Sequence, residues 1–249
     1  MKIVFSKKYD AHQESISQII REFDTKGKVL GEDSRNTIKL FKFEGRVLNI
    51  KSFKTPNLIN KIVYRFFRKS KAERSFRYAN YLLENEILTP YPIAFAQSKS
   101  GLFFGRSFYV SEHLDYDLTY RELIRNSDYV GDEKLLSAFA KFTFTLHEKN
   151  IQFLDHSPGN TLIRLTKREP EFYLVDLNRM KFGKLSFAER MQNFARLSPI
   201  KVQVEIMANT YATLIGKPKE VVFEAMWQVI SSFQDKFQRK KRWKKRFKI

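Results

Sequence analysis

Apolar residues near the N-terminus recur with the spacing of an α-helix. We predict a helix from Asp10 to Phe23, because apolar side chains three or four positions apart share one helix face. Its apolar positions are Ile16, Ile19, Ile20 and Phe23. Lys26-Gly27 follows and is typical of a helix end. The same spacing predicts a second helix of about four to five turns over residues 69–87, and Pro90 prevents a helix from continuing further.

Between these two helices, apolar and polar residues alternate as they do in β-strands. The alternation predicts a short strand at residues 28–30 and longer strands at 37–43 and 46–53, with Glu44-Gly45 as the turn between the longer two. Residues 93–114 are predicted to form a second hairpin around the turn Ser98-Lys99-Ser100-Gly101. We therefore expect an antiparallel sheet packed against a helix.

The second half of the chain is predicted to be mainly helical. Helical spacing begins near Gly131, and two short β-runs follow at residues 150–165 and 172–180, joined by the basic turn Thr166–Glu171. Everything after residue 180 is predicted to be helical.

These patterns predict an α+β protein with two lobes. The N-terminal lobe, residues 1–113, would hold the sheet and its helix, and the helical lobe, residues 114–249, would follow it. Because no Gly/Ser-rich linker separates them, we expect a hinge near residues 112–116.

Composition narrows the possible functions. The 249 residues carry 46 Lys+Arg and 27 Asp+Glu, a formal charge of +19, which excludes an acidic, disordered protein. The absence of cysteine excludes disulfide frameworks, thiolate metal sites and cysteine nucleophiles. The N-terminal apolar run, Ile3–Phe5, is far shorter than a signal-peptide core of roughly 7–15 residues, and no stretch approaches the roughly 20 residues of a membrane helix. A cytoplasmic location is therefore expected.

Three oxygen-bearing side chains stand at the ends of the predicted short strands. Asp155 and Asn160 lie in LDHSPGN, before the apolar run Thr161–Ile163, and Asp176 lies in LVDLN. Carboxylate and amide oxygens are the ligands that Mg²⁺ prefers, and Mg²⁺ is commonly shared with nucleotide phosphates. The set predicts phosphoryl transfer, which needs charge neutralisation and alignment more than covalent help.

Lys51 supplies the cation that this chemistry needs. It lies in the predicted strand VLNIKSF, on the same face as Val47 and Asn49 and opposite the apolar pair Leu48 and Ile50. We expect Glu73, in the first turns of the next helix, to pair with Lys51. Taken singly each of these residues is an ordinary turn or surface residue; the prediction rests on the ordered set.

In order and spacing, the segments VLNIKSF, KAERSF, HEKNIQFLDHSPGN and FYLVDLNR resemble those of the bacterial lipopolysaccharide core kinases, the Kdo and heptose kinases. That family has the protein-kinase-like fold, and the resemblance covers roughly residues 28–180. It implies that Asp155 is the catalytic aspartate and that Asn160 and Asp176 bind the metal.

The resemblance also implies how ATP is held. Lys51 would contact the phosphates, Glu73 would orient Lys51, and the backbone of Glu112 and Leu114 in the segment SEHL would contact adenine. The expected cofactors are therefore ATP and Mg²⁺.

Several positions depart from the protein-kinase pattern. Phe153 stands where His-Arg-Asp has its histidine, Asn178 replaces the glycine of Asp-Phe-Gly, and no Ala-Pro-Glu motif follows. Ser157 occupies the position of the lysine in Ser/Thr kinases, which favours a small-molecule acceptor. The expected phosphate loop, GEDSRN, contains only Gly31 where a glycine-rich loop is usual. His113, His147 and His156 lack metal-binding spacing and are interpreted as structural.

The C-terminal tail is the strongest compositional feature. From Arg239 onward, eight of eleven residues are Lys or Arg, interleaved with Trp243 and Phe247. A second cluster, INKIVYRFFRKSK, also mixes aromatic and basic residues. Such segments suit an anionic membrane surface, although nucleic acid would bind the same chemistry. The resemblance favours the membrane, because that family phosphorylates a lipid-linked sugar at the cytoplasmic leaflet.

We therefore expect an ATP-dependent kinase that phosphorylates a Kdo or heptose hydroxyl of the lipopolysaccharide inner core, peripheral on the inner membrane. Two alternatives stay open at this point. One is an atypical protein kinase of the RIO type. The other is a non-catalytic, kinase-like protein that binds anionic surfaces or nucleic acid.

Overall fold

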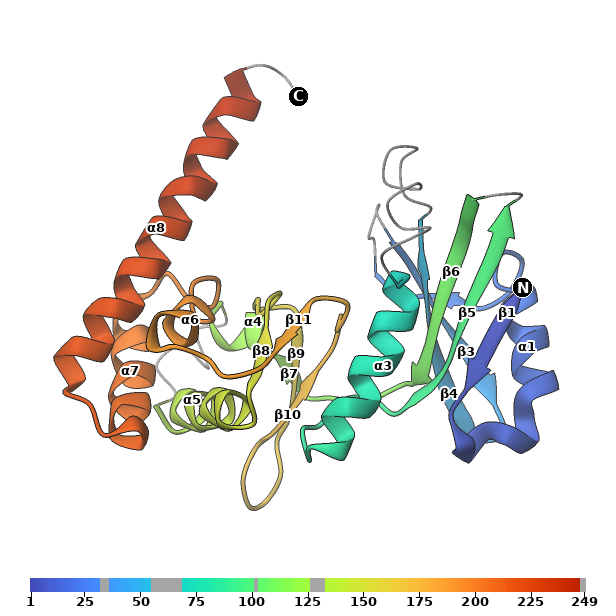
Figure 1. Cartoon of the computed structure of the whole chain (residues 1–249), viewed down its shortest axis with the longest axis horizontal. Helices are drawn as coiled ribbons and strands as arrows, with labels where there is room; N and C mark the ends of the chain where they lie inside the picture. The colour runs from blue at the N-terminus through green and yellow to red at the C-terminus, as the bar shows by residue number, and fades with distance from the viewer. Residues whose placement is uncertain (32–35, 55–68, 101–102, 126–132, 247–249) are drawn as a thin grey trace. The chain divides into compact units, whose positions relative to one another are not determined.

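The computed structural model describes residues 1–31, 36–54, 69–100, 103–125 and 133–246. They form two compact units (Figure 1). Unit 1 comprises Met1–Asp115 together with Asp176–Asn178, and unit 2 comprises Tyr116–Val175 together with Arg179–Ile249. The expected phosphate loop and most of the second basic cluster lie outside the described residues.

Unit 1 is built on a six-stranded antiparallel sheet with the order β1-β5-β6-β4-β3-β2. The strands are β1 (Lys2–Phe5), β2 (Lys28–Val29), β3 (Asn36–Phe43), β4 (Arg46–Phe53), β5 (Pro92–Ser100) and β6 (Phe103–Glu112). The turn between β3 and β4 is the predicted one. Its two residues, Glu44 and Gly45, both have positive φ angles, as a tight hairpin turn with the right twist requires.

Helices cover both faces of this sheet (Figure 1). On one face, helix α1 (Gln13–Arg21) packs Ile16 and Ile20 into a cluster with Leu48 and Ile50, and the short 3-10 helix η1 (Lys7–His12) adds Tyr9 to that cluster. Helix α3 (Lys71–Glu84) packs Ala72 and Phe76 against the other face. From Val47 to Lys51, buried residues of β4 alternate with exposed or half-buried ones, which leaves Lys51 on the side of the sheet opposite Ile50.

Unit 2 contains three short β-ladders and five helices in its described part. Its strands are β7 (Leu118–Thr119), β8 (Ile151–Phe153), β9 (Thr161–Arg164), β10 (Glu171–Leu174) and β11 (Met180–Phe182). Its helices are α4 (Tyr120–Leu123), α5 (Glu133–Glu148), α6 (Phe187–Gln192), α7 (Lys201–Ile215) and α8 (Lys219–Arg246). The core lies between α5, α7 and α8, where Phe139 stacks on Tyr120 with ring centroids 4.2 Å apart.

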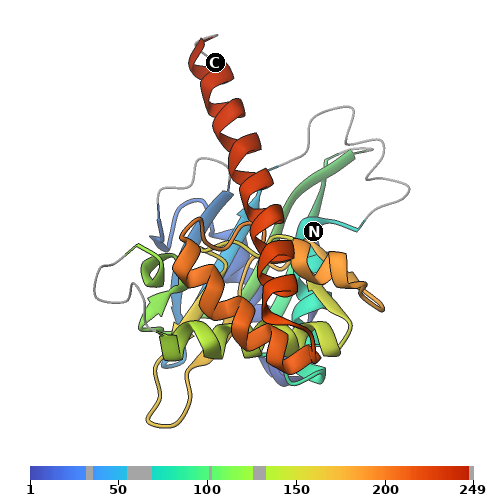
Figure 2. The same cartoon turned by 90° about the vertical axis from the view of Figure 1, so that its left-hand side faces the viewer.

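Helix α8 has two different halves. Val222, Met226 and Ile230 are buried in the core of unit 2, whereas Phe237 and Trp243 in the second half are more than half exposed. This second half extends away from the other helices of the unit (Figure 2). More than half of the Phe237 and Trp243 side-chain surface therefore faces solvent, on a helix segment that also carries many Lys and Arg residues.

Several short elements escaped the sequence-based prediction. The prediction of helix everywhere after residue 180 is wrong at β11, which pairs antiparallel with β8. Three residues are too few to show a period, so only the tertiary pairing reveals this strand. The predicted turn at residues 98–101 is also displaced, because β5 continues through an irregularity at Gln97/Lys99 to Ser100.

Candidate active site

Unit 1 brings Lys51 and Asp176 into direct contact. Lys51 Nζ lies 2.8 Å from Asp176 Oδ1, although the residues are far apart in the sequence. The Lys51 side chain is 14% exposed and the Asp176 side chain 31%, so the ion pair is shielded from much of the solvent that would weaken it. The Phe53 ring lies 5.4 Å from the ammonium and closes off one side. These two predicted residues therefore form one charged site.

The backbone at Asp176 is unusual. Its φ angle is +59°, in the left-handed region that costs most residues energy but that Asp and Asn adopt more readily than others. Asn178 Nδ2 donates to Asp176 Oδ1 over 2.6 Å. Asn178, which stands where Asp-Phe-Gly has its glycine, therefore helps to hold the Asp176 carboxylate through its side-chain amide. The Asp-Phe-Gly pattern alone did not indicate this role.

Glu73 does not pair with Lys51 as expected. Glu73 Oε1 forms an ion pair with Nε of Arg77, one helical turn later, at 2.8 Å. The Glu73 backbone N–H donates to Ser70 Oγ at the start of α3. The Lys51 ammonium has Asp176 as its ion-pair partner instead. A favourable i,i+4 pair within α3 takes the carboxylate that would otherwise turn toward the strand.

Glu112 anchors the end of β6 through its side chain. Its Oε1 accepts from Lys8, Tyr9 and Arg46. Burial, together with the hydrogen bond to this carboxylate, raises the pKa of Tyr9 to about 12. The Glu112 backbone N–H donates to the Tyr91 carbonyl over 2.9 Å. An adenine contact at this residue would therefore use its carbonyl oxygen. The predicted adenine contacts at Glu112 and Leu114 stay predictions.

Unit 2 places Asp155 and Asn160 in one ordered loop. Asn160 Nδ2 donates to the Asp155 carbonyl over 2.9 Å, and the Asn160 carbonyl accepts from the Val175 N–H over 3.0 Å. With the amide nitrogen used in this way, the Asn160 Oδ1 atom is the part of the side chain left to accept or to coordinate. The loop that the spacing of Asp and Asn predicted is therefore held by its own hydrogen bonds.

Two arginines that the sequence did not single out hold the Asp155 carboxylate. Arg196 Nη1 lies 2.8 Å and Arg179 Nη1 lies 3.3 Å from Asp155 Oδ1. Arg179 directly follows the segment LVDLN, so its place in the sequence could have indicated that it lies near the predicted site residues. Arg196 lies in no recognisable motif and is 41 residues from Asp155, so only the fold shows the contact.

A buried chain of hydrogen bonds fixes the start of the loop that contains Asp155 and Asn160. Asn193 Nδ2 donates to the Phe153 carbonyl, which leaves Asn193 Oδ1 to accept from His147 Nε2 over 3.0 Å. His147 Nδ1 is then the acceptor for the Tyr211 hydroxyl at 2.7 Å. Burial lowers the pKa of His147 to about 4, so this histidine is neutral at pH 7. His147 is thus structural, as interpreted from the sequence.

His156, the residue after Asp155, is buried among aromatic rings. The rings of Phe139 and Phe153 lie 5.3 and 5.8 Å from it, and within the described chain neither ring nitrogen has a hydrogen-bond partner. Burial lowers the pKa of His156 to about 3. It is therefore also neutral at pH 7.

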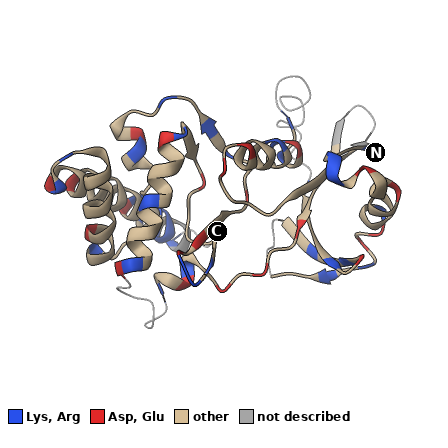
Figure 3. Ribbon diagram, turned by 90° about the horizontal axis from the view of Figure 1, so that it is seen from below, with Lys and Arg blue, Asp and Glu red and all other residues tan. Residues whose placement is uncertain are grey.

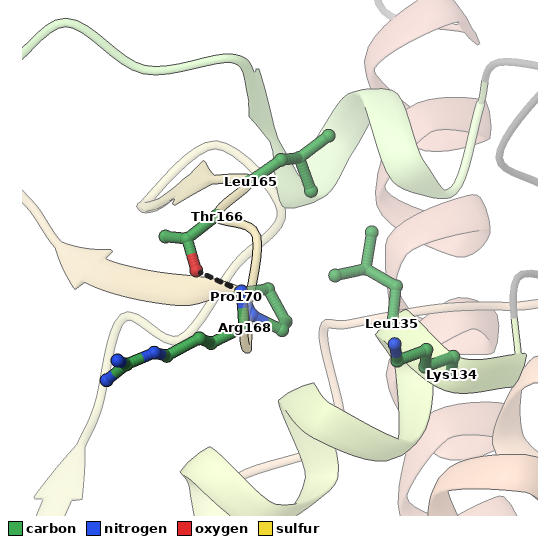
Figure 4. A pocket seen from close by; sticks show the side chains of 6 residues that line it. All are labelled: Lys134, Leu135, Leu165, Thr166, Arg168 and Pro170. Atoms are coloured by element: carbon green, nitrogen blue, oxygen red, sulfur yellow. Dashed lines mark hydrogen bonds between the residues drawn. The ribbon is translucent and has the colours of Figure 1, made fainter.

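Among the residues of unit 2 that the structure places, one cavity lies away from the predicted site residues and another lies beside them. One, of about 140 Å³, lies beside the β9–β10 turn and contains none of the predicted site residues. Figure 4 shows its walls, where Thr166 accepts from the Arg168 backbone and the Arg168 guanidinium points away from Leu135. The other, of about 210 Å³, lies against the loop that contains Asp155 and is lined by Leu154, His156 and Arg196 among others.

The model of the lipopolysaccharide kinase (Kdo/WaaP) family matches residues 21–216. The chain belongs to this family. The match spans both units and every predicted site residue, and it makes the protein a kinase that transfers a phosphoryl group. It favours the lipopolysaccharide kinase over the two alternatives left open by the sequence.

A solved structure described as "WaaP in complex with acyl carrier protein" has a similar fold. The TM-score is 0.65 at 14% sequence identity, over 96% of this chain and 99% of that one. This likeness confirms the two-lobed, kinase-like α+β fold. A search of curated protein sequences finds no match. No helix in the described ranges has the length and apolarity needed to cross a membrane.

The two buried histidines predict how stability depends on pH. An unfolded histidine takes up a proton near pH 6.5, whereas His147 and His156 take one up only near pH 4 and pH 3. Between pH 7 and pH 5 the unfolded state therefore binds more protons, and stability falls by about 2 kcal/mol per histidine. The carboxylates of Glu112 and Glu189, whose pKa values are lowered from 4.5, titrate below this window.

His156→Leu tests this directly, since it removes one buried histidine and two unpaired nitrogens. We expect the variant to lose about half as much unfolding free energy as the wild type between pH 7 and pH 5. Urea unfolding at both pH values measures the loss. An identical loss in both proteins would show that His156 is already charged or accessible in the folded state.

Proposed function

We propose that this kinase transfers the γ-phosphoryl group of ATP to a hydroxyl of a Kdo or heptose residue in the lipopolysaccharide inner core. The observation that carries the proposal is the shielded ion pair of Lys51 with Asp176. Lys51 lies on strand β4, and Asp176 follows strand β10. Family membership supports the reaction class. The sugar is part of the proposal and rests on the resemblance.

Asp155 is the proposed base. It orients the acceptor hydroxyl and takes up its proton as the hydroxyl oxygen bonds to the γ-phosphorus and the bond to the β-phosphate oxygen breaks, which releases ADP. Its Oδ1 atom is held by Arg179 and Arg196, so Oδ2 is the oxygen that meets the hydroxyl. The Asn160 side chain supports the same loop from within.

Lys51 is proposed to neutralise the ATP phosphates. In the structure its charge is balanced by Asp176, and phosphate oxygens share the ammonium when the nucleotide is bound. Glu73 belongs to the proposed nucleotide-binding set only through the family pattern, since its carboxylate is paired with Arg77.

The oxygens of Asn160 and Asp176 fit Mg²⁺. Asn160 keeps Oδ1 after its amide nitrogen is used, and Asp176 keeps Oδ2 after Oδ1 is used. Both are hard oxygen donors of the kind that Mg²⁺ prefers. When bound, the ion supplies additional neutralisation of the phosphates.

Asp155→Asn tests the proposed base. The substitution keeps the size of the side chain and removes its basicity, and a positioned general base commonly contributes about 10²–10⁴-fold to the rate. We expect phosphorylation of Kdo–lipid A with Mg-ATP to fall by this factor. The matched control is Asp10→Asn, an exposed aspartate of unit 1, which should keep the wild-type rate. Equal rates in Asp155→Asn and the wild type would contradict the role of Asp155.

The second half of α8 is proposed to hold the enzyme on the anionic inner leaflet from the cytoplasmic side. Phe237 and Trp243 are 54% and 56% exposed there, among Lys and Arg residues. Other Lys and Arg residues are spread over both units with Asp and Glu among them (Figure 3). The tail is distinctive because exposed aromatic and basic side chains occur together, which gives the two signals that stable anchoring needs.

The charge reversal Lys240→Glu/Lys241→Glu/Arg242→Glu tests the tail. Each basic residue near an anionic surface contributes about 1 kcal/mol, so we expect at least about 100-fold weaker binding to phosphatidylglycerol-containing vesicles. The control is Lys7→Glu/Lys28→Glu/Lys42→Glu, which changes the net charge equally at exposed positions of unit 1. Equal weakening in both triple variants would mean that net charge, not the tail, drives binding.

An acyl carrier protein is a second proposed partner, because the similar WaaP structure contains one. Nucleic acid is the less favoured partner of the tail.

A further inference from the structure

We infer that the cavity beside Asp155 is an acceptor subsite that binds an anionic group of the sugar substrate, with Arg196 as its anchor. This inference rests on the proposed function and adds a chemical requirement to it: the acceptor carries a carboxylate or phosphate close to the hydroxyl that is phosphorylated.

The cavity lies next to the proposed base. It has a volume of about 210 Å³, and its walls include Leu154 and His156, the two sequence neighbours of Asp155. Arg196 lines the cavity and also contacts the Asp155 carboxylate at 2.8 Å. A group bound to Arg196 is therefore separated from Asp155 by the width of one guanidinium. A hydroxyl on the same or the neighbouring sugar could reach the base.

The cavity has walls from three parts of unit 2. The first part is β8 with the loop after it, which contributes Gln152, Leu154 and His156. The second is the end of α6 with the turn after it, and the third is α8; they contribute Gln192, Asn193, Ala195 and Arg196, and Phe233, respectively. The Asn193 amide is fixed by His147 and the Phe153 carbonyl, and Gln152 Nε2 donates to the Glu189 carbonyl. Because these walls are held by buried hydrogen bonds, the site is shaped before a ligand arrives.

Arg196 has the capacity to hold an anion as well as Asp155. A guanidinium has five N–H donors, and Nη1 faces the aspartate while the Phe233 ring lies 5.4 Å from the guanidinium carbon. The side chain is 40% exposed, and in the described chain its guanidinium has no further hydrogen-bond partner. The planar fork binds carboxylate and phosphate with particular strength.

The other observations agree with a polar ligand of limited size. His156 is buried to 1% exposure with two unpaired ring nitrogens, an uncommon state for an imidazole beside a cavity. The volume is below the roughly 300–1,000 Å³ of pockets for drug-sized ligands. It therefore accommodates one substituted sugar group, and the rest of a lipid-linked acceptor lies outside.

The test compares three acceptors in the full-length enzyme with Mg-ATP: Kdo–lipid A, the same molecule with its sugar carboxylate reduced to an alcohol, and the same molecule without its lipid A phosphates. We expect kcat/KM of the wild type to fall about 10- to 100-fold for one of the two modified acceptors, the effect of one charge-assisted hydrogen bond. The acceptor that loses activity identifies the source of the anion.

Arg196→Gln should remove this discrimination, so that the variant uses all three acceptors equally well, and Arg196→Lys should restore part of it. Arg179→Gln is the matched control, because Arg179 also holds Asp155 but does not line the cavity. It should lower kcat for all acceptors by one common factor and keep the discrimination.

Two results would overturn the subsite. Wild-type enzyme that uses all three acceptors equally would show that no anion is recognised, while phosphorylation itself would still support the proposed function. Discrimination that persists unchanged in Arg196→Gln would place the recognition of the anion elsewhere. Failure of the wild type on every acceptor would instead reject the proposed function, and the subsite with it.

Discussion

The ion pair of Lys51 with Asp176 is the interaction on which the proposed chemistry depends. It connects the polar face of β4 with a three-residue segment, Asp176–Asn178, that belongs to unit 1 although its chain neighbours belong to unit 2. The left-handed backbone at Asp176 and the bond from Asn178 aim the carboxylate at the ammonium. A cation balanced in this way can exchange part of its carboxylate contact for phosphate oxygens without leaving a buried charge unpaired.

The surroundings of Asp155 differ from those of Lys51. Lys51 is paired with one carboxylate, whereas the Asp155 carboxylate is held by two arginines. Arg179 and Arg196 share its Oδ1 atom, while the loop around it is fixed by Asn160 and by the buried chain through Asn193 and His147. These charge-assisted bonds orient the carboxylate. In the proposed mechanism the same arginines also set the charge that an approaching acceptor meets, which would link the position of the proposed base to acceptor recognition.

The long elements and the spacing of the site could be predicted from the sequence, because each leaves a local signal. Alternation in VLNIKSF placed Lys51 opposite Ile50, and the Asp155–Asn160 spacing indicated a loop that the structure closes with a hydrogen bond. What could not be predicted depends on long-range pairing. The β11 strand, the Arg196 contact and the competition of Arg77 for Glu73 arise only when distant or alternative partners meet in the fold.

The most direct test of the central claim is the affinity for Mg-ATP of the wild type and Lys51→Met, measured by calorimetry and by the thermal stabilisation that a ligand of the folded state produces. Lys42→Met, an exposed lysine on the neighbouring strand β3, is the control. If Lys51 carries the phosphate contact, its variant binds at least about 10-fold more weakly, since a hydrogen bond to a charged group contributes about 1.5–3 kcal/mol. Equal affinity in Lys51→Met and the wild type would contradict the claim.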